Sequence, residues 1–131
     1  MKKSLLNLFT YSLALFLLVF GFIHFNSPDS MTAFFPDAVP RQTRLFLIYL
    51  SGAAEIILGT GLFMPRFRKM AALLTIVMLI VYLPLHIRDL FLKYPAIGSK
   101  NVAIIRVFVQ FILIYLLWLV SKTKPPSPEN D

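Results

Sequence analysis

The sequence contains no cysteine. The chain therefore forms no disulfide, holds no thiolate-bound metal and cannot itself carry out thiol exchange. For the same reason, cysteine usage does not indicate the redox compartment in which the protein works.

The sequence also lacks the short motifs that mark common catalytic and cofactor sites. There is no G-x-S-x-G, no phosphate-binding loop and no dinucleotide fingerprint. Its two histidines do not form an H-x-x-x-H pair, so we expect no metal site and assign no catalytic residue. We expect no intrinsic cofactor.

Charged residues make up only 15% of the chain, whereas 58% is hydrophobic and the mean hydropathy is +0.76. Four apolar stretches approach the roughly 20 residues that a helix needs to cross a bilayer. They predict an all-α, integral membrane four-helix bundle that forms one domain over residues 1–121. The predicted spans are 5–25, 43–64, 70–90 and 102–120.

The net charge of +7 does not indicate a nucleic-acid partner, because the basic residues flank the spans and form no basic domain. Seven basic residues lie on the membrane side that holds the termini and five lie on the other side, so the positive-inside rule predicts that both termini are cytoplasmic. The membrane that we expect is a bacterial inner membrane. We expect residues 122–131 to form a disordered cytoplasmic tail, because they are polar and rich in proline.

The connection between the first two spans is long and carries its own helix signal. Ser27 is a candidate N-cap and Pro28 suits the first helical position, while Met31, Phe34 and Phe35 supply an apolar face. We predict a short interfacial helix here that ends before the following proline. The segment either covers the bundle as a lid or only links two spans.

Glu55 is the one carboxylate inside the second span, where burial without a partner is costly. Gly52 and Gly59 share its helical face, and glycines on a spanning helix allow close approach by a neighbour. We expect Glu55 to face the bundle interior, with Gly21, Gly52 and Gly59 as packing positions.

Arg106 and Gln110 lie four residues apart in the fourth span and share one face. We predict that Arg106 pairs with Glu55 across the second and fourth helices, with Gln110 beside it. His24, Tyr82 and His86 approach from the same side of the membrane. The predicted polar core or ligand site therefore consists of His24, Glu55, Tyr82, His86, Arg106 and Gln110.

Several segments together resemble the DoxX-like family of small four-helix membrane proteins. They are "GFIHF" at 21–25, "YLSGAAEIILGTGLFMPRFRKMAA" at 49–72, Pro84 and "RVFVQFILIYLLW" at 106–118. The resemblance covers most of the chain, although the family pattern has Asn where His86 stands and Pro where Phe108 stands. It implies the four-helix fold and an association with membrane redox systems or with receptor assembly, without an established set of catalytic residues.

Two functions follow as hypotheses. In the first, the bundle holds a lipophilic ligand such as a quinone in its outer half and acts as an accessory subunit beside a membrane or peripheral redox partner. In the second, the protein is an assembly factor or scaffold whose Glu–Arg pair is purely structural. Both involve membrane lipid, and both leave open whether the protein forms a homo-oligomer.

Overall fold

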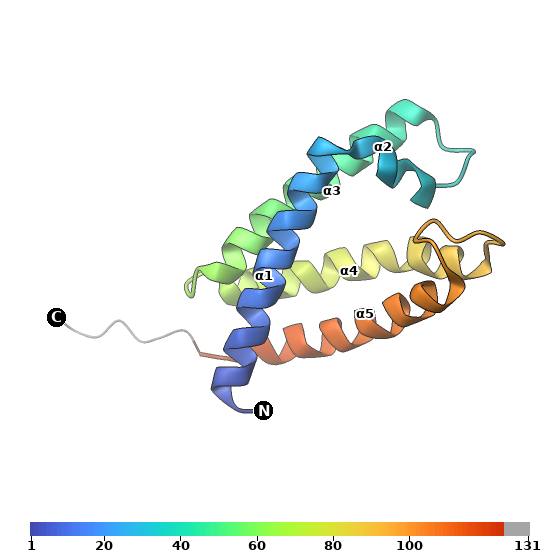
Figure 1. Cartoon of the computed structure of the whole chain (residues 1–131). Coiled ribbons are helices and arrows are strands. Elements are labelled where there is room, and N and C mark those ends of the chain that lie inside the picture. Colours follow the sequence, from blue (N-terminus) through green and yellow to red (C-terminus); the bar gives the residue numbers. More distant parts are fainter. Residues whose placement is uncertain (125–131) are drawn as a thin grey trace.

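A computed structural model describes residues 1–124 of the chain, and all the secondary-structure elements in this range are helices (Figure 1). Four long helices, α1, α3, α4 and α5, are each long and apolar enough to span a bilayer. Their bounds are α1 Lys3–Asn26, α3 Arg41–Phe63, α4 Arg68–Phe91 and α5 Lys100–Ser121. The predicted membrane fold is confirmed, and residues 125–131 of the predicted tail lie outside the described residues.

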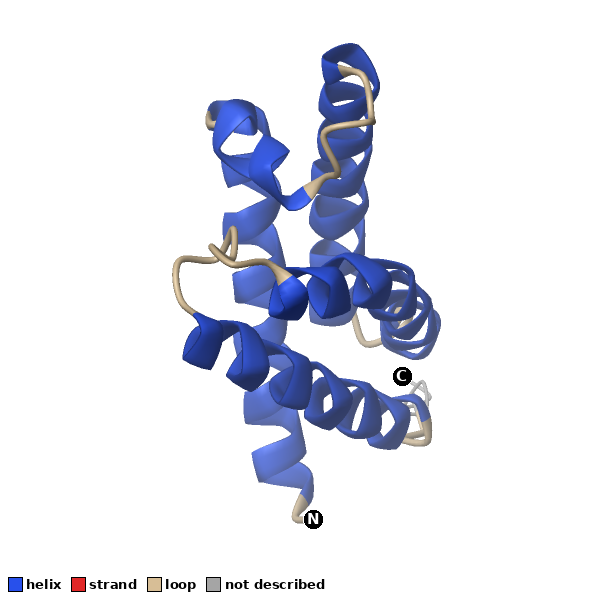
Figure 2. Ribbon diagram, turned by 90° about the vertical axis from the view of Figure 1, so that its right-hand side faces the viewer, coloured by secondary structure: helices blue, strands red, loops and turns tan. Residues whose placement is uncertain are grey.

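The predicted short helix between the first two spans is also present. It consists of α2, Pro28–Met31, followed by a single 3₁₀ turn, η1, Thr32–Phe34. Pro28 occupies the first turn as expected, but the Ser27 side chain makes no capping hydrogen bond. Figure 2 shows the loops that join the helices, and no strand occurs between residues 1 and 124.

The long helices associate as two pairs, α1 with α3 and α4 with α5. α3 also packs on α4 and α1 on α5, whereas α3 does not contact α5 within the described chain. Seen from the side, the two pairs diverge from the end that holds the N-terminus and the last turn of α5 toward the opposite end (Figure 1).

Glycine brings α1 and α3 close together. A Cβ on Gly21 would lie 2.8 Å from the Gly52 carbonyl oxygen, and one on Gly59 would lie 2.9 Å from the Ala14 carbonyl oxygen. No side chain fits at such separations from backbone atoms, so the crossing depends on residues that lack a Cβ. This crossing sets the depth at which the polar residues of α1 and α3 meet.

The apolar core lies toward the end of the molecule that carries the termini. It is built from the first half of α1, the last turns of α3 and α5, and the first turn of α4, with Leu13, Leu62, Ala72 and Leu117 among its buried residues. Toward the opposite end, where the helix pairs diverge, the buried side chains include Glu55, Asp89 and Gln110. The buried carboxylates and the buried amide therefore lie outside the apolar core, whereas the buried hydroxyl groups of Thr10, Thr75 and Ser121 lie near it and donate to carbonyl oxygens of their own helices.

Candidate functional site

The predicted polar core divides into two clusters, and α4 contributes residues to both of them. The Glu55 cluster lies between α1, α3 and α4 and contains His24, Ser51, Glu55 and Tyr82. The Arg106 cluster lies between α4 and α5 and contains His86, Asp89, Arg106 and Gln110.

Glu55 faces the interior, as its glycine-rich stripe predicts, and only 6% of its surface is exposed. Gly52 lies one turn earlier on α3, and a Cβ there would lie 2.7 Å from the His24 Cβ. This close approach brings the His24 ring to Glu55, with 3.4 Å between His24 Nδ1 and Glu55 Oε2.

His24 nevertheless gives Glu55 no well-formed hydrogen bond. Its Nδ1 lies 2.7 Å from the Phe20 carbonyl oxygen, and because a carbonyl only accepts, the Nδ1 proton points to Phe20. Glu55 Oε2 is buried and has no hydrogen-bond partner. One carboxylate oxygen is therefore left unsatisfied in an apolar span.

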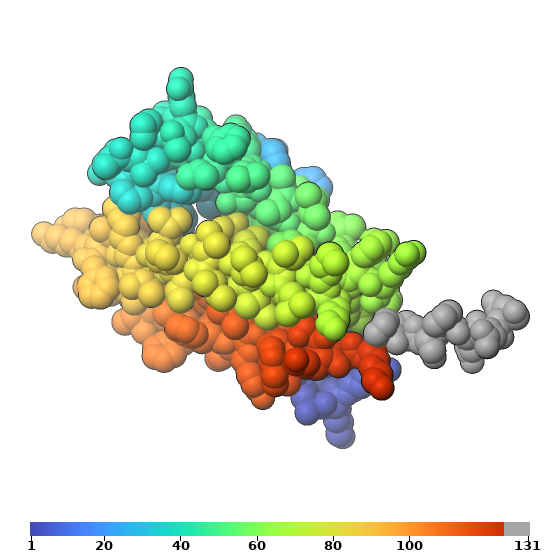
Figure 3. Space-filling model, turned by 180° about the vertical axis from the view of Figure 1, so that it is seen from behind, coloured from blue at the N-terminus to red at the C-terminus, as the bar shows by residue number. Residues whose placement is uncertain are grey.

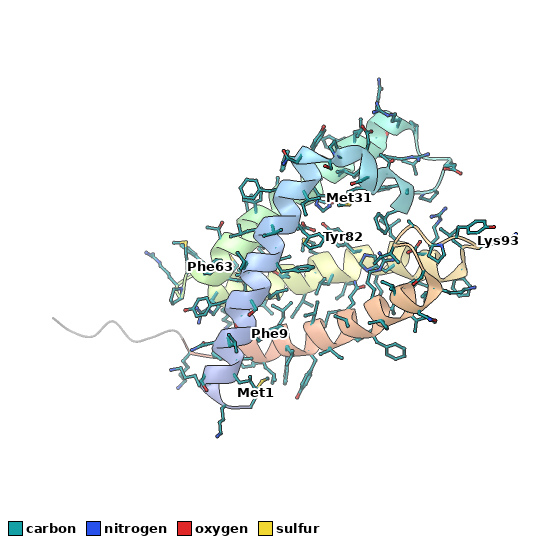
Figure 4. All side chains as sticks on the ribbon, in the orientation of Figure 1. Met1, Phe9, Met31, Phe63, Tyr82 and Lys93 are labelled. Carbon is teal, nitrogen blue, oxygen red and sulfur yellow. The ribbon has the colours of Figure 1, made fainter. Side chains whose placement is uncertain are left out.

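Tyr82 supplies a second unsatisfied oxygen in the same region. Figure 4 shows its side chain pointing from α4 into the space below Met31 and toward the α1–α3 pair. Its hydroxyl faces Ser51 and Glu55 but is buried without a hydrogen bond. The predicted polar core did not include Ser51, although this residue lies one turn before Glu55 on α3.

The predicted Glu55–Arg106 ion pair is wrong. Arg106 donates from Nη2 to Asp89 Oδ2 at 2.9 Å, and in the described chain Glu55 has no arginine partner. The reason is the helix arrangement: α5 packs on α4, and α3 does not contact α5. Arg106 of α5 consequently pairs with Asp89, which lies near the end of α4.

Asp89 is the polar residue that sequence reasoning missed. It is 1% exposed, and besides Arg106 it accepts a hydrogen bond from the Ala96 amide at 2.6 Å and another from the Ile97 amide at 3.4 Å. One carboxylate thus joins the end of α4, the loop that follows and α5. The signal was available, because Asp89 lies three residues after His86 and shares its helical face.

Gln110 is also held by α4 and does not reach Glu55. His86 Nδ1 donates to Gln110 Oε1 at 2.6 Å, and Gln110 Nε2 donates to the Leu79 carbonyl oxygen. Both ends of the amide are satisfied, so these bonds fix the register of α4 against α5. The hydrogen bond of His86 therefore belongs to the Arg106 cluster, while its ring lies 6.3 Å from the ring of Tyr82 in the Glu55 cluster.

A hollow opens between the helix pairs on the face seen in Figure 3. Figure 3 shows it between the cyan and teal atoms of α2, η1 and the start of α3 and the yellow atoms of α4. Phe34 of η1 closes part of this end, because the Arg106 guanidinium lies 5.2 Å from its ring centroid. That contact favours the lid interpretation of the segment that carries α2 and η1.

Between residues 1 and 124 there is no group of three histidine or acidic side chains that would hold a metal ion. What the Glu55 cluster offers is a pair of unsatisfied oxygens, a carboxylate and a phenol, inside an apolar wall.

Comparison with known proteins identifies a family and gives no activity. No curated protein and no solved structure matches the chain. A family model described as a domain of unknown function, DUF8561, matches residues 13–121, a range that includes every residue of both clusters. The chain therefore belongs to the DUF8561 family of domains of unknown function.

Proposed function

We propose that this membrane protein binds a lipophilic ligand with a polar head, such as a quinone, and acts as a DoxX-like accessory subunit of a membrane redox system. The observation that carries the proposal is the pair of buried oxygens, Glu55 Oε2 and Tyr82 Oη, that lack partners. Each unsatisfied group costs about 1–3 kcal/mol. A ligand oxygen between α3 and α4 that bonds both would remove that cost.

The position of the cluster supports a ligand that arrives from the bilayer. The apolar core is packed toward the end that holds the termini, while the hollow lies where the helix pairs diverge. With both termini in the cytoplasm of a bacterial cell, that end is the outer half of the inner membrane. A long apolar tail would remain in lipid while the head reaches the Glu55 cluster.

Electron transfer would then belong to a partner protein. The chain has no cysteine, and its described residues bring together no metal-ligand set. Its own contribution would be to hold the ligand head through Glu55 and Tyr82, with His24 beside Glu55.

The test is to look for the ligand in the purified protein. Wild-type protein is prepared in mild detergent, extracted with organic solvent, and the extract is analysed for quinones by mass spectrometry. We expect quinone in near-stoichiometric amount, and a loss of most of it in Tyr82→Phe. Tyr94→Phe is the matched control, because Tyr94 is 80% exposed and lies in the loop between α4 and α5.

Absence of quinone from wild-type protein, together with no binding of added decylubiquinone, would reject the proposal. That result would favour the second function, an assembly factor or scaffold with a structural polar core. Asp89 and Gln110 of the Arg106 cluster favour this alternative, because protein groups alone satisfy them, although Arg106 Nε is buried without a partner. The corresponding test is co-purification of a membrane partner that is lost in Phe34→Ala but not in Tyr82→Phe.

A further inference from the structure

The end of the molecule that holds the N-terminus and the last turn of α5 carries basic side chains that no acid of the described chain balances. We propose that Arg66, Lys69 and Lys122, here called the basic face, bind the headgroup of an anionic phospholipid. The lipid belongs to the leaflet that surrounds this end of the bundle. Neither Glu55 nor Tyr82 takes part, so this inference does not rest on the proposed function.

The first observation is the uneven distribution of charge. The acids between residues 1 and 124 are Asp29, Asp37, Glu55 and Asp89. Glu55 is buried within α3, and the other three pair with arginines at the end where the helix pairs diverge. The remaining two acids of the chain lie outside the described residues. The basic residues at the end with the N-terminus are Lys2, Lys3, Arg66, Arg68, Lys69, Lys122 and Lys124.

The second observation is that the protein uses one of these cations and leaves its neighbours unpaired. The Arg68 guanidinium donates to the Leu62 carbonyl oxygen at 3.1 Å and to the Tyr11 hydroxyl at 2.9 Å. Arg66, Lys69 and Lys122 are exposed, and within the described chain none of them forms an ion pair with an acid. Arg68 therefore joins α4 to α1 and α3, while the basic face is free to meet an anion.

The three cations come from adjacent parts of the fold. The start of α4 lies beside the end of α5, because Ala72 and Leu117 belong to the same buried apolar cluster. Lys69 and Lys122 consequently extend from neighbouring helix ends, and Arg66 lies in the turn that joins α3 to α4 (Figure 1). Since like charges repel, an anion on this face would relieve the repulsion among them.

The depth of the basic face favours a lipid over a soluble acidic partner. Lys69 lies in the first turn of α4 and Lys122 directly follows α5, and both helices are long and apolar enough to span a bilayer. Met70 and Trp118 beside them are 64% and 47% exposed, and the Lys122 ammonium lies 5.4 Å from the Trp118 ring centroid. Cations and aromatic rings at helix ends are typical of the membrane interface. A phosphodiester would meet the cations while the acyl chains lie along the apolar side chains.

The experiment measures lipid preference on the whole chain. Protein in mild detergent is titrated with phosphatidylglycerol or with phosphatidylcholine of the same acyl chains, and native mass spectrometry quantifies the lipid adducts. A basic residue near an anionic surface contributes about fivefold in affinity. We expect wild-type protein to bind phosphatidylglycerol at least about tenfold more tightly than phosphatidylcholine, and the preference to fall below about threefold in Arg66→Gln/Lys69→Gln/Lys122→Gln.

The matched control removes three charges from the opposite end. Arg41→Gln/Lys93→Gln/Lys100→Gln changes exposed residues there, and its lipid preference should stay within about twofold of the wild-type value. A second comparison needs no variant, so it decides the question even if a triple variant does not fold. The methyl phosphotriester of phosphatidylglycerol lacks the negative charge, and wild-type protein should bind it no better than phosphatidylcholine.

Each contrary result would overturn the proposal. Equal binding of phosphatidylglycerol and phosphatidylcholine by wild-type protein would show that the face does not select an anionic headgroup. A preference that survives the loss of Arg66, Lys69 and Lys122 would place the lipid elsewhere, and an equal fall in both triple variants would attribute it to net charge. Tighter binding of a soluble polyglutamate peptide than of phosphatidylglycerol would show that the face meets an acidic protein.

Discussion

Asp89 and Arg106 should be energetically coupled, whereas Glu55 and Arg106 should not. The 2.9 Å bond between Arg106 Nη2 and Asp89 Oδ2 is buried, with side-chain exposures of 17% and 2%. Removing one member of a buried ion pair leaves the other charge uncompensated and typically costs about 3–5 kcal/mol. Asp89→Asn and Arg106→Leu should each fall in this range.

Asp89 also stabilises the loop after α4, because its carboxylate accepts hydrogen bonds from the Ala96 and Ile97 amides. Asn at this position keeps one carbonyl oxygen for the Ala96 amide, so Asp89→Asn tests charge more than loop structure. The double variant should be more stable than the sum of the single changes predicts, since no unpaired charge remains in it.

The assay is a double-mutant cycle on the free energy of unfolding, measured in mixed micelles titrated with SDS. Coupling of more than about 1 kcal/mol is expected for Asp89 with Arg106, and additivity within about 0.5 kcal/mol for Glu55 with Arg106. Arg41→Leu is a control for loss of charge, because its ion pair with Asp29 is exposed and should contribute less than about 1 kcal/mol.

Two results would refute this reasoning. Additive losses for Asp89 and Arg106 would mean that their contact contributes nothing beyond the separate side chains. Strong coupling between Glu55 and Arg106 would mean that α3 and α5 approach each other in the membrane, against the arrangement of the two helix pairs.

Three further changes test the packing, the lid and the orientation. Gly52→Ala should destabilise the fold by about 1–3 kcal/mol, because the new Cβ would lie 2.9 Å from the Gly21 carbonyl oxygen; an unchanged unfolding curve would contradict the close crossing. Phe34→Leu removes the ring that the Arg106 guanidinium covers, so a spin label on η1 should show a longer and broader distance to α5; an unchanged distribution would argue against a lid. A phosphatase fused after the C-terminus should be inactive, because the dense basic turn 66–69 lies on the same side as both termini; periplasmic activity would reverse the orientation.

The positions of the helices could be predicted from hydropathy alone. The predicted spans 5–25, 43–64, 70–90 and 102–120 coincide with helices that each begin two residues earlier, and the second span ends one residue beyond α3. The reason is that a bilayer leaves the backbone no water to bond, so a long apolar stretch must be helical, and the helix continues into the polar interface. The interfacial helix was predictable too, because Pro28 marks a helix start locally.

The direction of Glu55 was predictable as well, since Gly52 and Gly59 on its face show which side of α3 is packed. The partner of Glu55 was not. A buried charge implies that compensation is needed, but periodicity within one helix does not tell which other helix lies opposite.

That choice depends on which helices pair. The close crossing at glycine joins α3 to α1, while the hydrogen bonds of Gln110 and Asp89 join α4 to α5. Arg106 therefore lies next to Asp89 and pairs with it instead of with Glu55. Chain order and hydropathy do not determine which of the four spans pack together. In a membrane, the surfaces that face lipid and the surfaces that face another helix are both apolar, so hydropathy does not distinguish them. Hydropathy and glycine spacing were therefore enough to place four helices and to turn Glu55 inward. Only the packing of the helix pairs decided that Glu55 and Tyr82 would be left without partners.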